Sequence, residues 1–505
     1  TLAFGVAGAA LGIASRRFPR LARFFALFVA CALLAWLDTL PDRGKSWLRF
    51  SIDLALLGAS GAALEGSWKN SLPARTSFAL LAAVVLAVPF GVLVRPVRGV
   101  VYEYASHARP LVRWASELGR RHPELGNVPC DGARRPPLAH RAPSPLSAGA
   151  RGADVLFVSL DAMRWDHADS VPSLWRELGP HVTFTRAVSP APRTEHACAA
   201  LLRGVPSRQV PNRESARALP TIAEILAKHG YRTVQVPTHR YFGPGRWPNA
   251  GFELALTPEF PETKRRRIVP ADSALNEALD IARTTPKPLL LWVHLMEGHE
   301  PYRWRGGQGP ASPEAQRRAF RDIDARVARF VREYRALRAE RPIVIAVFGD
   351  HGEEFGEHGG HFHSTRVYAE QVRVAFALAA PGLPASRVDA PVSLASLPAT
   401  LLDLLDLPLQ ATFTEPSLLG CIAARGRCPT VAVSQMIVFG RWIGYTFERH
   451  RLVVDPEHDI ERVYDSTSDP LEKHDLAPAE PALLDALRDR ARAFDHANCV
   501  ALEPG

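Results

Sequence analysis

The chain has 505 residues, too many for one ordinary core, so two or more domains are expected. Hydrophobic residues make up 47 % of it, but the 22 % of charged residues exclude a polytopic membrane protein throughout, so the apolar excess must be local. The net charge of +9 is not accompanied by a helix-turn-helix, zinc-finger or aromatic RNA-binding signature. We therefore expect no nucleic-acid partner, and assign this charge to solvated helix faces and to contacts with anionic lipid.

Four apolar runs in the first hundred residues predict a transmembrane region. They cover residues 2–14, 24–36, 52–64 and 78–94. Helices buried in a soluble domain usually keep one polar stripe, and these runs keep almost none. The last run is close to spanning length, and the middle two reach it if their flanking aspartates lie among the headgroups. We predict about four transmembrane helices within residues 1–110; a bundle of buried soluble helices is the alternative.

Charge at the turns predicts the orientation of this region. The turn after the first run, "SRRFPRLAR", has four arginines, and the turn after the third carries Lys69 and Arg75. Positively charged turns face the cytoplasm, so the fourth helix leads outward. We expect a multi-pass protein of the cell (inner) membrane whose remaining residues are extracytoplasmic. Because the sequence begins at Thr1 and not at a methionine, the number of helices upstream stays open.

Residues 111–152 and the cysteines fit this location. The segment is rich in Pro, Ala and Arg without periodicity, which predicts a semi-rigid linker. Cys421 and Cys428 lie close together in "LLGCIAARGRCPT". In an oxidising compartment, a small disulfide loop is the better interpretation of that pair than a metal site.

From about residue 153 to the end, apolar strands alternate with amphipathic helices. The expected strands are "DVLFVSL", "YRTVQV", "PLLLWVHL", "IVIAVF" and "VRVAFALA". The expected helices are "TIAEILAKHG", "DSALNEALDIAR" and a long arginine-rich segment. Continuous apolar strands interleaved with helices are typical of a mostly parallel α/β sheet covered on both faces. In such sheets, ligands bind beyond the carboxyl ends of the strands.

Candidate metal ligands follow two of these strands. The segment "VFGDHGEEFGEHGGHFH" places Asp350 and His351 just past "IVIAVF", and Asp161 lies just past "DVLFVSL". Two carboxylates and one imidazole at the same sheet edge suit a divalent cation such as Zn, Mn, Mg or Ca. Taken alone, each aspartate is more often a helix cap or a turn residue. The combination therefore predicts one divalent metal ion.

The sequence resembles the sulfatase-like branch of the alkaline phosphatase superfamily, which includes sulfatases and phosphoethanolamine and phosphoglycerol transferases. The resemblance rests on "VLFVSLDAMRWDH", "TEHACAALLRGVPSR", "LLWVHLMEGHEPY", "VFGDHGEEFGEHGGHFHSTRVYAEQVRVAF" and "RVYDSTSDPLEKHDLA". It implies a three-layer α/β/α alkaline-phosphatase-like catalytic domain over residues 153–505, with a small C-terminal subdomain.

The resemblance also implies site residues. The residues matching the family's metal ligands are Asp161, Thr194, Asp350 and His351. The residues matching its contacts with the substrate's anionic head are Arg164, His299 and His363. Thr194 matches the nucleophile, and His299 or His363 is expected to protonate the leaving group.

The residue at the nucleophile position sets this chain apart. Sulfatases have Cys or Ser there, in C/S-x-P-S-R, and oxidise it to formylglycine. Thr194 cannot become that aldehyde, because its carbinol carbon also bears a methyl group; the next positions hold His196, Ala197 and Cys198. A divalent cation and a helix N-terminus can nevertheless activate a threonine hydroxyl. The alternative is that Thr194 only caps the helix.

Other polar residues of these segments are less defined by sequence. His358 and His361 are open candidates for the site, and His294 is either a core histidine or part of the site. Three carboxylates are expected behind the site or at the surface: Glu353, Glu354 and Glu357.

Three functions fit the sequence. The first is a membrane-anchored, metal-dependent hydrolase or transferase that acts through a threonine on phosphate (or sulfate) esters of envelope lipids or glycans. The second is a sulfuric ester hydrolase, a sulfatase, acting on sulfated glycans. The third is a catalytically dead envelope protein that keeps the fold for binding. Membrane anchoring favours the first, because an attached enzyme meets such headgroups at high local concentration.

Overall fold

The computed structural model describes residue 146 and residues 149–497, apart from 211–215, 240–241, 243–248, 256–268, 427, 429–430, 437–440 and 457–458. The four apolar runs and most of the expected linker lie outside this part, so the division into a transmembrane region, a linker and a catalytic domain stays a prediction. Within the described residues, no helix combines the length and apolar character needed to span a membrane.

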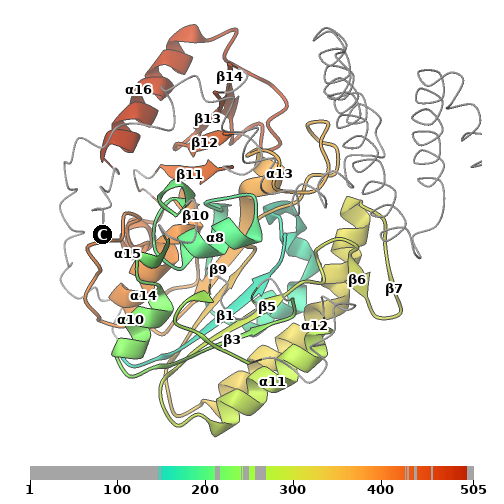
Figure 1. Cartoon of the computed structure of the whole chain (residues 1–505), viewed down its shortest axis with the longest axis vertical. Helices are drawn as coiled ribbons and strands as arrows, with labels where there is room; N and C mark the ends of the chain where they lie inside the picture. The colour runs from blue at the N-terminus through green and yellow to red at the C-terminus, as the bar shows by residue number, and fades with distance from the viewer. Residues whose placement is uncertain are drawn as a thin grey trace, which may run out of the picture. The chain divides into compact units, whose positions relative to one another are not determined.

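The fold is built on an eight-stranded sheet of order β10-β2-β9-β8-β1-β5-β3-β4 (Figure 1). Its strands are β1 (Asp154–Leu160), β2 (Val182–Val188), β3 (Arg232–Pro237), β4 (Glu253–Leu254), β5 (Leu289–Leu295), β8 (Ile343–Phe348), β9 (Arg373–Ala379) and β10 (Ser386–Ser393). β1 pairs in parallel with β5 and with β8, whereas β9 runs antiparallel to β8 and to β2. The mostly parallel sheet predicted from the apolar strands is confirmed, with β9 as its reversed member.

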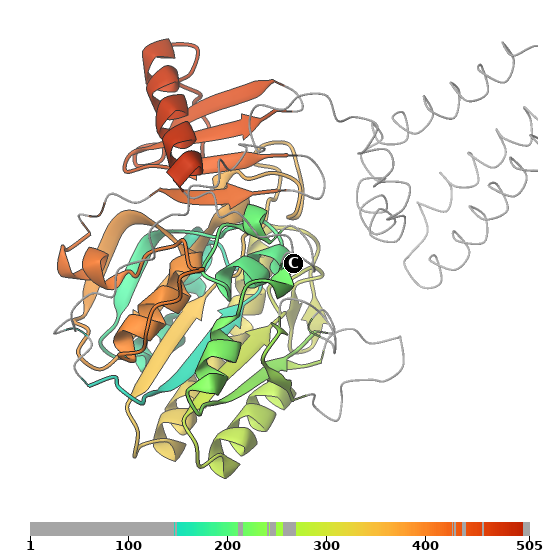
Figure 2. The ribbon, with the colours of Figure 1, turned by 60° about the vertical axis from the view of Figure 1, so that its left-hand side comes forward.

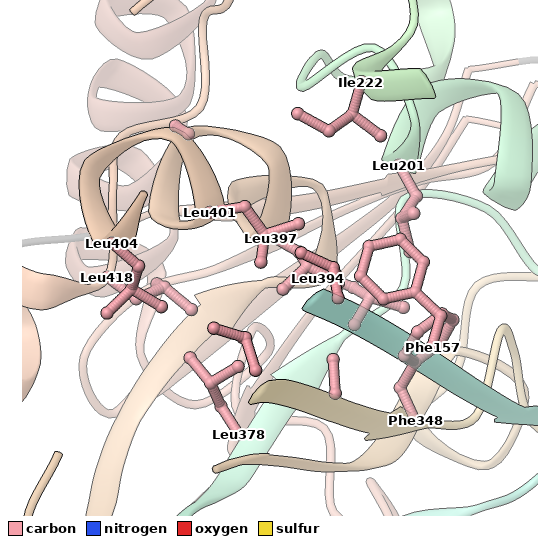
Figure 3. Close-up of a cluster of buried hydrophobic side chains, with 14 of the residues drawn as sticks. Phe157, Leu201, Ile222, Phe348, Leu378, Leu394, Leu397, Leu401, Leu404 and Leu418 are labelled. Atoms are coloured by element: carbon pink, nitrogen blue, oxygen red, sulfur yellow. The ribbon is translucent and has the colours of Figure 1, made fainter. Parts of the chain in front are cut away.

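Helices cover both faces of this sheet. One face packs against α7 (Pro172–Glu177), α11 (Ala271–Thr284) and α12 (Pro313–Leu337), and the other against α8 (Thr194–Leu201), α10 (Ile222–Lys228), α14 (Leu397–Leu404) and α15 (Leu419–Ala423). Alternate residues of β1 enter the two cores: Phe157 one, Val158 the other. In Figure 3, Leu394 lies beside the Phe157 ring, and Leu397 and Leu401 of α14 belong to the same core cluster. The three layers explain why the strands carry apolar residues continuously.

Local sequence signals set the helix ends. Thr221 begins α10 with a capping box, in which it accepts from the backbone N–H of Glu224 and the Glu224 side chain accepts in return. Ser312 caps α12, and Pro313 occupies its first turn. Shorter elements connect these helices: η3 (Trp165–Ser170), η4 (Ser207–Gln209), η7 (Leu394–Ser396), α13 (Ala369–Val372) and the hairpin of β6 (Arg303–Trp304) and β7 (Gly307–Gln308).

The C-terminal residues form a second, smaller sheet, as the family resemblance implies. It is antiparallel, in the order β11-β12-β13-β14, with bounds Ala432–Gln435, Ile443–Thr446, His450–Asp455 and Ile460–Asp465. α16 (Pro481–Ala497) packs on it with its own apolar core (Figure 2). Beside this subdomain, Cys421 and Cys428 form the disulfide expected from their spacing.

Candidate functional site

Asp161, Asp350 and His351 meet at the carboxyl ends of β1 and β8. These strands are parallel neighbours, so their ends lie at the same edge of the sheet, and all three side chains are buried. One potential ligand atom from each lies within 4.8 Å of the others. Asp161 Oδ1 and Asp350 Oδ2 are buried without a hydrogen bond. Buried carboxylate oxygens in that state are costly unless a cation compensates them, so this donor set fits a divalent ion.

Backbone groups orient two of these ligands. His351 Nδ1 lies 2.8 Å from the Gly352 carbonyl oxygen and donates to it, which leaves the Nε2 lone pair for the site. Asp350 Oδ1 accepts from the Ala162 N–H at 3.1 Å, and Asp350 Oδ2 lies 3.6 Å from His351 Nε2. The oxygen of Asp350 without a hydrogen bond is therefore the one that faces the imidazole.

Thr194 lies at the first position of α8, beside this cluster. Its Oγ1 is 3.2 Å from Asp161 Oδ2 and 3.0 Å from His351 Nε2. The N-cap of the helix is Arg193, in an extended conformation, so the interpretation of Thr194 as only a helix cap is wrong. The hydroxyl faces the carboxylate cluster at the positive end of the helix dipole, where negative charge on oxygen is stabilised.

A buried chain of hydrogen bonds holds Asp161. Trp292 Nε1 donates to Ser159 Oγ at 2.8 Å, and Ser159 Oγ lies 2.7 Å from His294 Nδ1. Because the Ser159 hydroxyl donates a hydrogen bond to Nδ1, the ring proton of His294 is on Nε2. This N–H donates a hydrogen bond to Asp161 Oδ2 at 3.2 Å. His294 is therefore both a buried histidine of strand β5 and a hydrogen-bond partner of the site. Its position near the end of that strand was the feature of the sequence that indicated this.

Charge and burial perturb Asp161 in opposite directions. Burial acts to raise its pKa, but the hydrogen bond from His294 and the nearby His299 and His351 outweigh that effect. The pKa of Asp161 is therefore held well below its usual range. Asp161 stays ionised, as a cation ligand must be.

His299 and His363 lie together beside the cluster. Their ring centroids are 5.1 Å apart, and the His363 ring is 4.3 Å from that of His351. Burial acts to lower the pKa of His299, but the charges of Asp161 and Glu353 outweigh it and raise the pKa. Burial and the neighbouring His351 and His299 lower the pKa of His363 well below its usual value. The two imidazoles therefore favour different protonation states, as a proton donor and a proton acceptor would.

Glu353 supports His363 from behind the site. Its Oε1 lies 3.0 Å from His363 Nδ1, and its side chain is fully buried. Burial raises the pKa of Glu353 to about 7, against the lowering effect of His299 and His351. Its expected place behind the site is confirmed, and a surface position is excluded.

Arg164 lies deeper than a residue that only contacts substrate would. Its side chain is 3 % exposed, and it donates from Nε and Nη2 to Asp166 at 2.8 and 2.7 Å. Nη1 donates to the Glu353 carbonyl oxygen at 2.9 Å and to Glu357. Four of its five N–H groups thus have protein acceptors. Its contact with the substrate stays a prediction, while its hold on Glu357 and on the Glu353 backbone is direct.

The remaining polar residues of the glycine-rich segment are structural or exposed. Glu354 is buried and accepts from the N–H groups of His358 and Gly360. His358 Nδ1 lies 2.6 Å from Glu370 Oε1, and its Nε2 donates to the Glu472 carbonyl oxygen at 2.8 Å. His361 is exposed. Neither open histidine belongs to the cation cluster found among the described residues.

A family model for sulfatases matches residues 153–407, which is half of the chain. The chain belongs to the sulfatase family. It is therefore a hydrolase of the sulfatase-like branch of the alkaline phosphatase superfamily, whose members use a divalent metal. No curated protein matches its sequence.

Solved structures share the fold of this sulfatase-family chain at low identity. A 2-O glycosaminoglycan sulfatase has 17 % identity and a TM-score of 0.56, over 68 % of this chain and 92 % of the other. The phosphonate monoester hydrolase of Agrobacterium radiobacter has 15 % identity and a TM-score of 0.54, over 69 % of this chain and 96 % of the other. A protein solved with its substrate D-glucosamine-2-N,6-O-disulfate has 14 % identity and a TM-score of 0.53, over 68 % of this chain and 98 % of the other. At these identities the likeness shows the alkaline-phosphatase-like fold alone.

Proposed function

We propose that this sulfatase-family hydrolase is membrane-anchored and cleaves or transfers phosphate esters of envelope lipids or glycans through Thr194. One observation carries the proposal: the Thr194 hydroxyl lies 3.2 Å from Asp161 Oδ2 and 3.0 Å from His351 Nε2, at the start of α8. A nucleophile at a helix N-terminus, beside the candidate ligands of a cation, is placed to react with an anionic ester.

Asp161, Asp350 and His351 would hold the divalent cation, with Thr194 beside them. A bound cation would neutralise charge on the ester's oxygens and lower the pKa of a coordinated hydroxyl. The protein's own part is to orient both carboxylates. The Ala162 N–H and the His294 imidazole do this by occupying Asp350 Oδ1 and Asp161 Oδ2.

The reaction we propose has two displacements at phosphorus. Thr194 Oγ1 gives its proton to solvent and forms a bond to phosphorus, and the bond from phosphorus to the leaving oxygen breaks. His299, whose pKa is raised, protonates that oxygen. A water or an acceptor hydroxyl then attacks the phosphothreonine, aided by neutral His363 as proton acceptor. Breaking the bond between phosphorus and Oγ1, with uptake of a proton from solvent at Oγ1, regenerates the threonine.

Sulfate esters are the second candidate substrates. The solved relatives include a 2-O glycosaminoglycan sulfatase and a protein bound to a disulfated glucosamine, which supports a sulfated glycan. Thr194 favours phosphate, since threonine cannot form the aldehyde hydrate whose collapse expels sulfate. A threonine phosphate monoester also carries up to two negative charges where a threonine sulfate carries one, so it gains more from a cation and a helix N-terminus. The hydrogen-bond-deficient oxygens of Asp161 and Asp350 argue against a catalytically dead protein.

A screen of model esters tests the function. We expect the full chain, supplied in turn with Mn²⁺, Zn²⁺, Mg²⁺ and Ca²⁺, to hydrolyse bis(p-nitrophenyl) phosphate faster than p-nitrophenyl sulfate. Mass spectrometry of peptides from protein quenched during turnover of a slow phosphodiester should locate the phosphoryl group, still esterified to the retained alcohol, on Thr194. Efficient turnover of the aryl sulfate without phosphodiesterase activity would overturn the assignment.

Anchoring and orientation need a separate test. We propose that the apolar runs before residue 110 cross the membrane and that the described domain lies outside the cytoplasm. Alkaline phosphatase fused after Gly152 should be active, and a fluorescent protein that folds only in the cytoplasm should stay dark there. The reverse pattern would refute the orientation without affecting the chemistry.

A further inference from the structure

Gln316 of α12 lies where two loops of the site meet. It is buried, and its Nε2 donates to the Ala162 carbonyl oxygen at 3.1 Å and to the Gly298 carbonyl oxygen at 3.1 Å. Ala162 follows Asp161 in sequence, and Gly298 precedes His299. One side-chain amide thus joins the loop of a cation carboxylate to the loop of a histidine that faces the site.

The two loops fit tightly at this point. A Cβ at Gly298 would lie 2.7 Å from the Asp161 carbonyl oxygen and 2.3 Å from the Phe320 ring, so only glycine fits. Ala162 has a φ of 57°, in the left-handed region, and its N–H donates to Asp350 Oδ1. The Ala162 residue therefore contacts Asp350 through its N–H and Gln316 through its carbonyl. A displacement of this residue would move both carboxylates of the cluster.

A histidine fixes the orientation of the Gln316 amide. His167 Nδ1 lies 2.6 Å from Gln316 Oε1. Since both amide hydrogens point at carbonyl oxygens, Oε1 must face His167, and His167 donates. The His167 ring also stacks on Phe355, with centroids 6.2 Å apart and planes inclined by 23°. Every polar atom of the Gln316 side chain thus has a partner, which makes one orientation strongly preferred.

We propose that Gln316 is a positioning residue of the active site: it fixes the separation between the Asp161 loop, which would hold the cation, and the His299 loop, which would face the ester. The activity part of the proposal rests on the proposed function, whereas the cation part does not. Reacting groups held in loops need this support, because a displacement of about 1 Å can reduce turnover by about 100-fold.

A second polar residue of α12 provides a matched control. Asp324 is also buried and accepts from the backbone N–H groups of Ser173 and Leu174 at 2.9 and 2.8 Å, at the start of α7. Gln316→Met removes three side-chain hydrogen bonds and Asp324→Leu removes two, and each change replaces a buried polar side chain of α12 by an apolar one. Only the first removes bonds to the loops of the site.

The experiment compares both variants in the full-length chain. Calorimetric titration of metal-free protein with Mn²⁺ and steady-state hydrolysis of bis(p-nitrophenyl) phosphate are the readouts. We expect similar falls in Tm, but Gln316→Met alone should bind Mn²⁺ about tenfold more weakly and lose about 10–100-fold in kcat with a small change in KM, the range seen for groups that orient metal ligands. Equal Mn²⁺ affinity and equal kcat in the two variants would overturn the proposal.

A second variant keeps the test decisive if Gln316→Met does not fold. His167→Phe keeps the ring stacked on Phe355 and removes only the donor to Gln316 Oε1, so it should give a smaller loss of Mn²⁺ affinity and kcat. Parent-like values in folded His167→Phe protein would then overturn the proposal. If the parent chain cleaves no phosphodiester, the proposed function fails, while the Mn²⁺ comparison still decides the role of Gln316.

Discussion

Asp350 and Glu354 lie four residues apart in one glycine-rich segment, and both are buried, but their surroundings differ. Asp350 Oδ1 accepts one backbone N–H, and Oδ2 has no hydrogen bond. Glu354 accepts from two backbone N–H groups and from Gln371 Nε2 at 2.7 Å. A buried carboxylate whose hydrogen bonds are complete stabilises the local backbone conformation. A buried carboxylate that has an oxygen without a hydrogen bond, beside another acid, is suited to bind a cation. Both are acidic residues of the same glycine-rich segment, and the sequence distinguishes them only because Asp350 comes just after a strand.

The largest effect should come from the hydroxyl that faces the incompletely paired carboxylates. Thr194→Ala should lose activity by about 10³-fold or more, since removing a nucleophile costs up to about 10⁶-fold in other hydrolases. Mn²⁺ affinity should fall only modestly, because both carboxylates and the imidazole remain. Phosphodiesterase assays and calorimetric titration measure the two quantities.

Thr194→Ser is the matched control for that variant. It keeps an oxygen nucleophile at the start of α8 and should retain part of the turnover. Parent-like activity in Thr194→Ala would show that another group attacks the ester.

Asp350→Asn should separate cation binding from folding. Replacing a ligand should weaken Mn²⁺ binding by about 100-fold or more, since even groups that only orient ligands contribute about 10–100-fold. Metal-free protein should be no less stable than the parent, because the change removes one of two carboxylates that repel each other without the ion. Elemental analysis and thermal unfolding check both expectations; undiminished metal content would exclude Asp350 as a ligand.

Glu354→Leu should produce the opposite result. The change leaves the N–H groups of His358 and Gly360 and one N–H of the Gln371 amide without an acceptor, and each buried unpaired group costs about 1–3 kcal/mol. We expect a loss of about 3 kcal/mol in the free energy of unfolding, measured by urea denaturation. Protein that folds in the presence of Mn²⁺ should keep much of its affinity; a stable variant that has lost the metal would reverse the assignment of the two carboxylates.

The position of the metal cluster could be predicted from sequence because it follows from topology. Apolar strands interleaved with helices predicted a parallel sheet, and the residues directly after two strands, Asp161 and Asp350, had to share an edge of it. The antiparallel direction of β9 could not be predicted in this way, because a buried strand has the same apolar sequence in either direction.

The supporting hydrogen bonds could not be predicted, because they join residues far apart in the chain. Gln316 lies among arginines on an amphipathic helix, where a glutamine usually faces solvent, and its partners come from two other loops. His167 follows the Arg164 motif without a signal of its own. Periodicity indicates which face of a helix is buried, but not which carbonyl oxygens that face will meet.

The smallest effect concerns two buried histidines with opposite pH dependence. Burial lowers the pKa of His167 to about 4, so the folded protein binds fewer protons than the unfolded chain between about pH 4 and 6.5. Its contribution to stability is complete above pH 6.5 and is lost as the pH falls. Linkage gives a loss of about 1 kcal/mol between pH 7 and 5.5. His167→Phe should remove this part of the acid destabilisation, measured by urea unfolding at the two pH values.

His358 is the control, because its pKa is shifted the other way. Burial acts to lower that pKa, but the hydrogen bond and the charge of Glu370 outweigh it and raise the pKa. Its contribution to stability is present below pH 6.5 and is lost as the pH rises through the folded-state pKa. Removing it in His358→Asn should therefore increase the destabilisation between pH 7 and 5.5, whereas His167→Phe should reduce it. If both variants changed the acid destabilisation in the same direction, at least one histidine would have the wrong protonation state assigned to it.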